Sequence, residues 1–321
     1  MSSDRTRLGS SGQLVRRLGF GCEQLGGYEW GRVDPGEVIA AVELAVGAGI
    51  TLFDTADCYG RGESERRLGE ALARHRDATV IATKFGVRFS DSGSVFYDSS
   101  PQWAEAALEA SLRRLRTDRV DLLQMHYWDG VSPIAALFET LERLRERGKI
   151  RWYGVTNHAP LSVAAADYPG LVSASLEYSL IERSQEAAAR VFGSAGLTFL
   201  SHGTLGQGML SGKYSAGARF EAGDRRAHVR YRNFHGERLA RNARVVDTLA
   251  AQARELGASP GQLAIAWVLC TLPGSVALVG IKRPDQLRDA LGALNLQLAP
   301  AVLAVLDRAS ARPPAGADQA P

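Results

Sequence analysis

Eight short apolar runs, most of them separated by a longer amphipathic run, are the feature that most restricts how this chain folds. In chain order they are RLGFG, ITLFDT, TVIATK, VDLLQMH, IRWYGV, LVSASLEY, LTFLSH and VALVGI. Runs of this length and composition predict buried strands, and strands that alternate with helices predict parallel pairing through right-handed crossovers. The sequence therefore predicts an α/β protein with one parallel sheet.

The intervening runs carry helix signals. They include PGEVIAAVELAVGAG, SERRLGEALARH, PQWAEAALEASLRRLR and PIAALFETLERLRERG. In the last of these, Leu137, Leu141 and Leu144 lie on one face and charged residues on the other, which is typical of an amphipathic helix. Asp or Ser followed by Pro marks two helix starts, and Gly marks two helix ends just before a strand.

An open doubly wound sheet and a closed eight-stranded barrel both fit this alternation. The dinucleotide-binding form of the open sheet has GxGxxG after its first strand, and GFGCEQLGG does not provide it. The strand count favours a single (β/α)8 TIM barrel over residues 13–309, with its active site at the C-terminal face. Two long connections, 86–100 and 203–239, would lie on that face. Residues 1–12 are expected to be a flexible N-terminal segment and residues 310–321 a disordered tail.

Composition excludes several classes of protein. The 321 residues are 45% hydrophobic and 23% charged, as in soluble globular proteins. The net charge of +3 comes without basic runs, so neither nucleic acid nor a membrane surface is an expected partner. No stretch approaches the ~20 apolar residues of a membrane span. Three scattered cysteines predict neither a disulfide framework nor a metal site, and indicate the cytoplasm. The sequence carries no signal for an oligomeric state.

Polar residues end three adjacent predicted strands. Asp54, Lys84 and His126 follow apolar runs, and Tyr59 lies one short turn after Asp54. In a barrel these strand ends meet at one mouth. A Lys ammonium lowers the pKa of a nearby phenol, a carboxylate holds the Lys, and a His can hydrogen-bond a carbonyl oxygen. The group suits protonation of an oxygen while hydride reaches the carbon from a cofactor. The alternative is a structural Asp54–Lys84 salt bridge with Tyr59 and His126 packed beside it.

FDTADCYGRGESERRLGEAL, TKFG, LLQMHYWD, GVTNH, LEYSL and LGQGMLSGKY occur in the order in which the aldo-keto reductase family has them. The chain resembles that family from about Leu14 to about Leu294. The resemblance implies a (β/α)8 barrel that reduces aldehydes, ketones or keto-sugars with NADPH. It implies Tyr59 as the general acid, Lys84 as the residue that tunes it, Asp54 as the support of Lys84, and His126 as the group that orients the carbonyl.

The same resemblance implies a set of cofactor contacts along the chain. They are Gly21, Cys22, Asp54, Thr156, Asn157, Ser175, His202, Leu205, Gln207, Gly208, Lys213, Lys282, Gln286 and Asp289. Lys282, with Arg283 beside it at a helix start, favours a 2′-phosphate and hence NADPH over NADH. This chain departs from the family at several positions. Ser175 stands where the family usually has Gln, and His202 stands where the family has the aromatic residue that stacks on the nicotinamide. Cys22 replaces Thr and Ala290 replaces Asn.

The substrate pocket is expected to be lined by Trp30, Cys58, Tyr127 and Trp128, with Phe96 or Tyr97 closing it from the long segment 86–100. Aromatic walls suit an apolar or ring-shaped carbonyl compound, although each residue could instead serve packing. A slow-turnover NADPH-binding subunit of the same fold is an alternative. A metal-dependent barrel hydrolase using His126, His158 and His202 is a further alternative. The sequence does not favour it, because no His-x-His follows the first predicted strand. The segment QGMLSGKY is similar to a phosphate-binding Walker loop, but it lacks the first Gly and the Ser/Thr of that motif. A nucleotide triphosphatase is therefore not expected.

Overall fold

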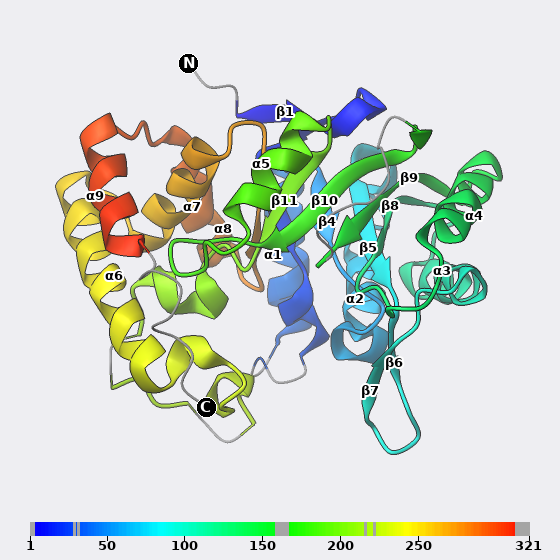
Figure 1. Cartoon of the computed structure of the whole chain (residues 1–321), viewed down its shortest axis with the longest axis horizontal. Helices are drawn as coiled ribbons and strands as arrows, with labels where there is room; N and C mark the ends of the chain where they lie inside the picture. Colours follow the sequence, from blue (N-terminus) through cyan, green and yellow to red (C-terminus); the bar gives the residue numbers. More distant parts are fainter. Residues whose placement is uncertain are drawn as a thin grey trace.

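Eight parallel strands close into a barrel surrounded by helices, as the sequence predicts (Figure 1). The computed structural model describes residues 4–27, 30, 33–157, 167–214, 217–220 and 223–311. In barrel order the strands are β3 (Leu18–Gly21), β4 (Leu52–Asp54), β5 (Val80–Phe85), β8 (Val120–Met125), β9 (Ile150–Thr156), β10 (Leu171–Glu177), β11 (Thr198–His202) and β12 (Val276–Gly280). Each of the eight predicted runs overlaps one of them, and β5 and β9 extend one residue beyond their runs.

The helices cover the outside of the barrel. They are α1 (Pro35–Gly47), α2 (Glu63–Ala71), α3 (Pro101–Leu115), α4 (Ile134–Glu146), α5 (Glu186–Ser194), α6 (Gly236–Glu255), α7 (Pro260–Thr271), α8 (Pro284–Gly292) and α9 (Pro300–Ser310). The predicted helix starts are confirmed in two cases. Asp34 accepts hydrogen bonds from the amides of Gly36 and Glu37 at the start of α1, and Ser100 accepts one from Trp103 at the start of α3. Such caps satisfy amides that have no partner within the helix.

Side-chain alternation along the strands separates two cores. Alternate residues of the strands point into the barrel, where Leu52, Val80, Leu122, Leu200 and Val276 form an apolar layer. Their neighbours point outward into the larger cluster beneath the helices. Because the side-chain period of a strand is two, the positions two or four residues further along also face the interior, nearer the C-terminal end. Polar residues occupy several of these positions, and the candidate active site is built there.

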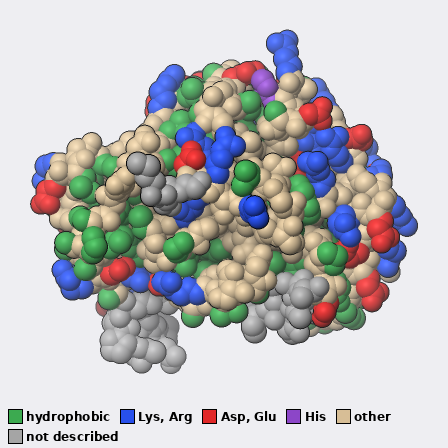
Figure 2. Space-filling model, turned by 90° about the horizontal axis from the view of Figure 1, so that it is seen from above, with side chains coloured by type: hydrophobic (Ala, Val, Ile, Leu, Met, Phe, Trp, Pro, Cys, Tyr) green, Lys and Arg blue, Asp and Glu red, His purple; other side chains and the backbone are tan. Residues whose placement is uncertain are grey.

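A hairpin covers the N-terminal end of the barrel (Figure 1). It consists of β1 (Arg5–Arg7) paired antiparallel with β2 (Leu14–Arg16), and its Leu8 and Val15 are fully buried against the inner apolar layer. Residues 5–11 thus have regular structure, in the part of the chain expected to be a flexible segment, and residue 13 lies within the hairpin. Seen from this end of the molecule, basic and acidic side chains are interspersed (Figure 2). The boundaries of the barrel domain stay a prediction.

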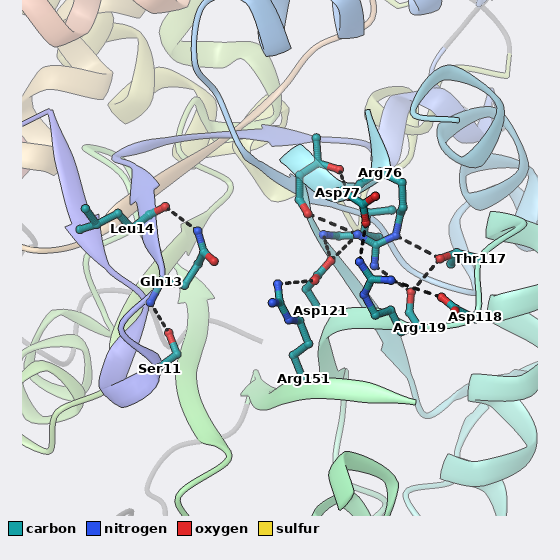
Figure 3. A network of polar contacts seen from close by, with 12 residues as sticks. Ser11, Gln13, Leu14, Arg76, Asp77, Thr117, Asp118, Arg119, Asp121 and Arg151 are labelled. Carbon is teal, nitrogen blue, oxygen red and sulfur yellow. Dashed lines mark hydrogen bonds and ion pairs between the residues drawn. The ribbon is translucent and has the colours of Figure 1, made fainter. Parts of the chain in front are cut away.

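A charged network near the same end ties strands to their connections (Figure 3). Asp121 of β8 is fully buried, accepts a hydrogen bond from the Ile81 amide at 2.9 Å, and pairs with Arg76 at 2.8 Å and with Arg151 at 3.4 Å. Arg76 also donates to the backbone oxygen of Arg119 at 2.8 Å. A buried carboxylate with several donors is compensated for its lost hydration. We assign this network to the stability of the barrel.

The two long connections lie at the opposite end. Residues 86–100 contain a second hairpin, β6 (Val87–Phe89) paired with β7 (Val95–Tyr97), which projects from the barrel in Figure 1. The alternation in VRF and VFY around a Ser-Asp-Ser-Gly turn is the signal that could have revealed it. The described part of 203–239 forms short 3-10 turns before α6 begins at Gly236. Among the residues that the structure describes, no helix has both the length and the apolar character needed to cross a membrane.

Candidate active site

A buried ion pair occupies the centre of the barrel mouth. Lys84 Nζ donates to Asp54 Oδ1 at 2.5 Å and to the backbone oxygen of Thr55 at 2.9 Å, and the two charged side chains are 3% and 6% exposed. β4 and β5 are neighbours in the barrel, with Asp54 opposite Ala82, so both side chains face inward from adjacent strands. Breaking such a pair leaves an uncompensated buried charge. The pair is therefore held in one geometry.

Gln124 completes this support, and sequence reasoning missed it. Its side-chain nitrogen donates to Asp54 Oδ2 at 3.0 Å, so both carboxylate oxygens have a donor. Its side-chain oxygen lies 3.5 Å from the Thr156 hydroxyl. Gln124 is fully buried. It stands two residues before His126 in LLQMH, and the strand period of two could have placed it on the inner face.

Tyr59 reaches the mouth because the turn after β4 is tight. Gly60 has φ +56, and a Cβ there would lie 2.3 Å from the backbone oxygen of Gly26. A side chain is excluded at that position, and the turn packs directly on the connection that follows β3. Lys84 Nζ lies 5.2 Å from the centroid of the Tyr59 ring, and the His126 ring meets the Tyr59 ring edge-on at 5.9 Å. The four residues predicted from strand ends thus come together.

The pKa of Tyr59 differs from the expectation. Burial raises the pKa of the Tyr59 phenol well above its usual value, and the negative charges of Glu23 and Asp54 raise it further. We expected Lys84 to lower this pKa, but the net shift is upward, because burial and the neighbouring negative charges raise the pKa. Tyr59 therefore holds its proton at neutral pH, as a general acid must.

His126 is neutral for a related reason. It is 8% exposed, and burial, together with the positive charge of Lys84, lowers its pKa well below the usual value for histidine. Its amide donates to the Phe85 oxygen at 2.8 Å, which fixes it just after β8. A neutral imidazole has one N–H donor and one acceptor nitrogen, so it can donate one hydrogen bond to a carbonyl oxygen.

Polar groups from the next strands lie on the far side of the mouth. Thr156 ends β9 and Ser175 lies in β10, opposite each other in the sheet. The Ser175 hydroxyl donates to the Leu200 oxygen at 2.8 Å and lies 3.1 Å from His202 Nδ1. Burial lowers the pKa of His202 to about 3, so its ring is neutral and flat. Asn157, whose φ is +56, donates from its side chain to the His126 oxygen at 3.3 Å.

The connection after β11 supplies another predicted group. Gln207 and Gly208 both have positive φ, which turns the chain sharply. The Gln207 side chain donates to Glu177 at 3.3 Å and accepts from Asn233 at 2.8 Å. Leu205 is half-buried against the core, and Lys213 is exposed. These contacts attach the connection to the rim of the barrel at the end of β10.

Cations gather where α8 begins. Lys282 Nζ donates to the Trp30 oxygen at 3.0 Å, and burial, then the charges of Arg283 and Arg226, lowers the pKa of Lys282. The guanidinium groups of Arg225 and Arg226 lie 5.2 and 5.6 Å from the Trp30 ring centroid. Sequence reasoning missed these two arginines, because the connection 203–239 contains several other arginines and nothing in its pattern distinguishes this pair. Arg225 already pairs with Glu23, Arg226 with Asp224 and Arg283 with Asp285, so the positive charge is partly neutralised, and an anion bound here would add a further partner for these cations.

The remaining predicted cofactor residues lie on or next to α8 and at the end of β3. Gln286 accepts a hydrogen bond from the Lys282 amide at 3.0 Å, and Asp289 is exposed on α8. Gly21 ends β3, with room for little more than its hydrogen, because a Cβ there would lie 3.0 Å from the Val279 backbone. The Cys22 side chain is fully buried in the cluster beneath the helices, and its thiol contacts the Phe20 oxygen at 3.5 Å. Burial, and then the negative charge of Asp54, raise the pKa of the Cys22 thiol, so the thiol lies within electrostatic reach of the Asp54–Lys84 pair.

Three of the predicted substrate residues contact His126 or stack on a residue that does. Cys58 Sγ lies 3.6 Å from His126 Nδ1, and Tyr127 stacks on the His126 ring at 5.1 Å. Tyr97 of β7 stacks in turn on Tyr127 at 4.7 Å, so the hairpin reaches the site through that ring. Trp30 lies beneath Arg225 and Arg226, nearer the cation group.

Two other predicted substrate residues lie at the rim. Trp128 donates its indole N–H to the Ser132 oxygen at 2.9 Å and is 37% exposed. Phe96 lies under the Arg88 guanidinium at 5.1 Å. Within the described ranges, no three His, Cys, Asp or Glu side chains come together as ligands for a metal, and His158 lies outside those ranges.

Comparison with known proteins agrees with this geometry. The sequence model of the Aldo/keto reductase family matches residues 17–311. The chain belongs to the aldo/keto reductase family. As a member of that family it is an oxidoreductase. Family membership agrees with the closed barrel and with the order of the motifs along the sequence.

Curated relatives and solved structures are similar along most of this aldo/keto reductase. Aldo-keto reductase YhdN of Bacillus subtilis is 32% identical over 288 residues, 88% of this chain and 86% of the relative. Aldo-keto reductase yakc of Schizosaccharomyces pombe, whose name specifies NADP(+), is 30% identical over 313 residues, 94% of this chain and 90% of the relative. The glycerol dehydrogenase AKR11B4 from Gluconobacter oxydans is 29% identical, with a TM-score of 0.86 over 98% of both chains.

Proposed function

We propose that this aldo/keto reductase reduces the carbonyl group of an aldehyde, ketone or keto-sugar with NADPH, and that Tyr59 is its general acid. The observation that carries the proposal is the convergence of a protonated phenol, a neutral imidazole and a buried ion pair at one barrel mouth. A salt bridge that served stability alone would not need Tyr59 and His126 beside it. The NADP(+) in the name of the yakc relative supports the choice of cofactor.

Each residue of the group has a separate task. Tyr59 gives its proton to the carbonyl oxygen as that oxygen becomes an alkoxide. His126, neutral at physiological pH, donates a hydrogen bond to the same oxygen and fixes its position. Lys84 places a positive charge beside the phenol, which stabilises the phenolate left after proton transfer. Asp54, with Gln124 and the Thr55 oxygen, fixes the position of Lys84.

The residues present fit NADPH, which supplies hydride to the carbonyl carbon when it is bound. Thr156, Asn157 and Ser175 would hold the carboxamide, and the flat, uncharged ring of His202 would lie against the nicotinamide. At the other end, the cation group around Lys282 suits a phosphate. The Trp30 indole N–H beside that group is buried without a hydrogen-bond partner among the described residues, as expected for a donor that awaits a ligand.

The walls of the mouth favour an apolar or ring-shaped substrate. Tyr97, Tyr127 and His126 form a continuous stack, and Cys58 adds an uncharged surface because burial raises the pKa of its thiol. Aromatic faces bind planar or apolar groups better than hydrated ones. The scattered free cysteines fit a reducing compartment, and we propose the cytoplasm.

Oxidation of NADPH followed with a panel of aromatic, aliphatic and sugar-derived carbonyls tests the proposed function. We expect turnover with at least one class and preference for NADPH over NADH. Tight NADPH binding without turnover on any class would instead support the slow-turnover cofactor-binding protein. Weak binding of both cofactors would overturn the proposal altogether.

Lys282→Ala is expected to weaken NADPH binding by about 10- to 100-fold and NADH binding by less than about 3-fold. The reason is the loss of one charge-assisted hydrogen bond to a phosphate that NADH lacks. Dissociation constants from fluorescence titration with both cofactors measure the difference. Lys149→Ala is the matched control, since Lys149 pairs with Glu109 on the outside of the barrel. Equal losses for the two cofactors would place the 2′-phosphate elsewhere.

Tyr97→Ala is expected to raise KM for aromatic aldehydes by about 2- to 10-fold and to leave short aliphatic aldehydes nearly unchanged. The substitution removes one stacked pair, Tyr97 on Tyr127, which contributes about 0.5–1.5 kcal/mol. Steady-state kinetics on a matched pair of aldehydes give the comparison. Phe96→Ala serves as the control on the same hairpin, because Phe96 lies under Arg88. An identical change for both aldehydes would argue against a role for Tyr97 in substrate choice.

A further inference from the structure

His126 can act as a hydrogen-bond donor to a substrate through one ring nitrogen at a time. A neutral imidazole carries its single proton on Nδ1 or on Nε2, and the partner of one nitrogen decides which. His126 is neutral because it is buried beside Lys84. The assignment of its tautomer therefore decides whether it attracts or repels a carbonyl oxygen in the mouth.

The His126 ring is held on several sides. Tyr127 stacks on one face at 5.1 Å with an angle of 24° between the planes, and Tyr59 meets it at an angle of 85°. Asn157 donates to its backbone oxygen. Among the described residues, the hydrogen bond found for the ring itself joins Nδ1 to Cys58 Sγ at 3.6 Å. This leaves Nε2 as the nitrogen that can contact a ligand.

We propose that the Cys58 thiol donates its S–H to Nδ1 and so holds His126 in the tautomer that carries the proton on Nε2. Cys58 is in this account a positioning residue, acting through His126. The inference deepens the proposed function, on which it rests, because a proton on Nε2 is what a carbonyl-orienting histidine needs.

The chemistry of the thiol favours this direction of donation. Burial raises the pKa of Cys58 far above neutrality, so the sulfur keeps its proton, and a thiol is a weak donor as well as a weak acceptor. A ring nitrogen with a lone pair is a stronger acceptor than a thiol sulfur. When the thiol donates its S–H to Nδ1, the proton of the thiol therefore meets the stronger acceptor of the two groups.

The test is a direct measurement of the tautomer. Protein labelled with ¹⁵N-histidine gives the protonation state of each ring nitrogen from long-range ¹H–¹⁵N correlations, with His126 assigned by the loss of its signals in His126→Gln. We expect Nε2–H in the wild-type protein, the same tautomer in Cys58→Ser, and a mixture of tautomers in Cys58→Ala. Cys270→Ala, which removes an exposed thiol on α7, is the control and should leave His126 unchanged.

The kinetics should follow the tautomer. We expect kcat/KM to fall about 3- to 10-fold in Cys58→Ala and to recover in Cys58→Ser, with the dissociation constant for NADPH unchanged. A wild-type His126 protonated on Nδ1 would overturn the proposal. So would a Cys58→Ala protein with an unaltered tautomer. Because the spectrum needs no substrate, these outcomes are separate from a failure to find any reducible carbonyl, which would count against the proposed function instead.

Discussion

Tyr59→Phe is expected to lower kcat for carbonyl reduction by about 10²- to 10⁴-fold, the usual contribution of a positioned general acid. The ring and its packing against His126 are kept, and the hydroxyl that carries the proton is removed. Because burial holds Tyr59 protonated, the wild-type rate should depend little on pH near neutrality. Single-turnover reduction followed by NADPH absorbance measures the chemical step.

The cofactor should bind this variant within about 3-fold of the wild-type affinity, since the phenol lies outside the proposed phosphate and carboxamide contacts. Tyr168→Phe is the matched control, because it removes a hydroxyl from a half-buried tyrosine packed on Phe138, away from the mouth. Retention of full activity in Tyr59→Phe would remove Tyr59 from the mechanism. Loss of NADPH binding would show that the hydroxyl serves the cofactor instead.

Lys84→Met is expected to abolish reduction and to lower the free energy of unfolding by about 3–5 kcal/mol. The substitution leaves Asp54, 6% exposed, as a buried carboxylate without its cation. Gln124 still donates to Asp54, and this bond offsets part of the loss. Denaturant titration gives the free energy, and single-turnover kinetics give the rate.

The double variant Asp54→Asn/Lys84→Met separates folding from catalysis. With both charges removed, its stability should return to within about 1–2 kcal/mol of the wild-type value, while the rate stays as low as in Lys84→Met. Lys149→Met, an exposed paired lysine, should change the stability by less than about 1 kcal/mol. A double variant no more stable than Lys84→Met would mean that the unpaired charge is not the cause of the loss. Recovery of activity in the double variant would show that Lys84 has no catalytic role.

The polar positions of the mouth could be predicted because strand alternation is a local property. Asp54 and Lys84 each stand an even number of residues after the apolar inner positions Leu52 and Val80, so one pattern places the core and the polar residues above it. Gln124 obeys the same rule two residues after Leu122, and it could have been included. The polar N-terminal hairpin could not be placed as readily, because its burial depends on two residues, Leu8 and Val15, that meet the open end of the finished barrel.

The protonation state of the proposed catalytic groups depends on parts of the chain that are far apart in sequence. The pKa of Tyr59 follows from burial and from the charges of Glu23, Asp54 and Tyr127, which come from the connection after β3, the end of β4 and the connection after β8. The expected position of Lys84 beside Tyr59 at the barrel mouth predicted a shift of this pKa in the opposite direction. The arrangement of Arg225 and Arg226 around Trp30 likewise joins the connection after β11 to the one after β3.

Local patterns in the sequence predict the barrel, the positions of its strands along the chain, and which chemical groups stand at the strand ends. These follow from periods of two and 3.6 residues and from turn residues, all of which act over a few neighbours. The protonation of Tyr59 and His126, the burial of the Cys22 thiol beneath the helices, and the contact between Cys58 and His126 depend on the folded arrangement of the chain. The reason is that desolvation and side-chain contact are sums over every element that closes around a group, and those elements meet only when the barrel has formed.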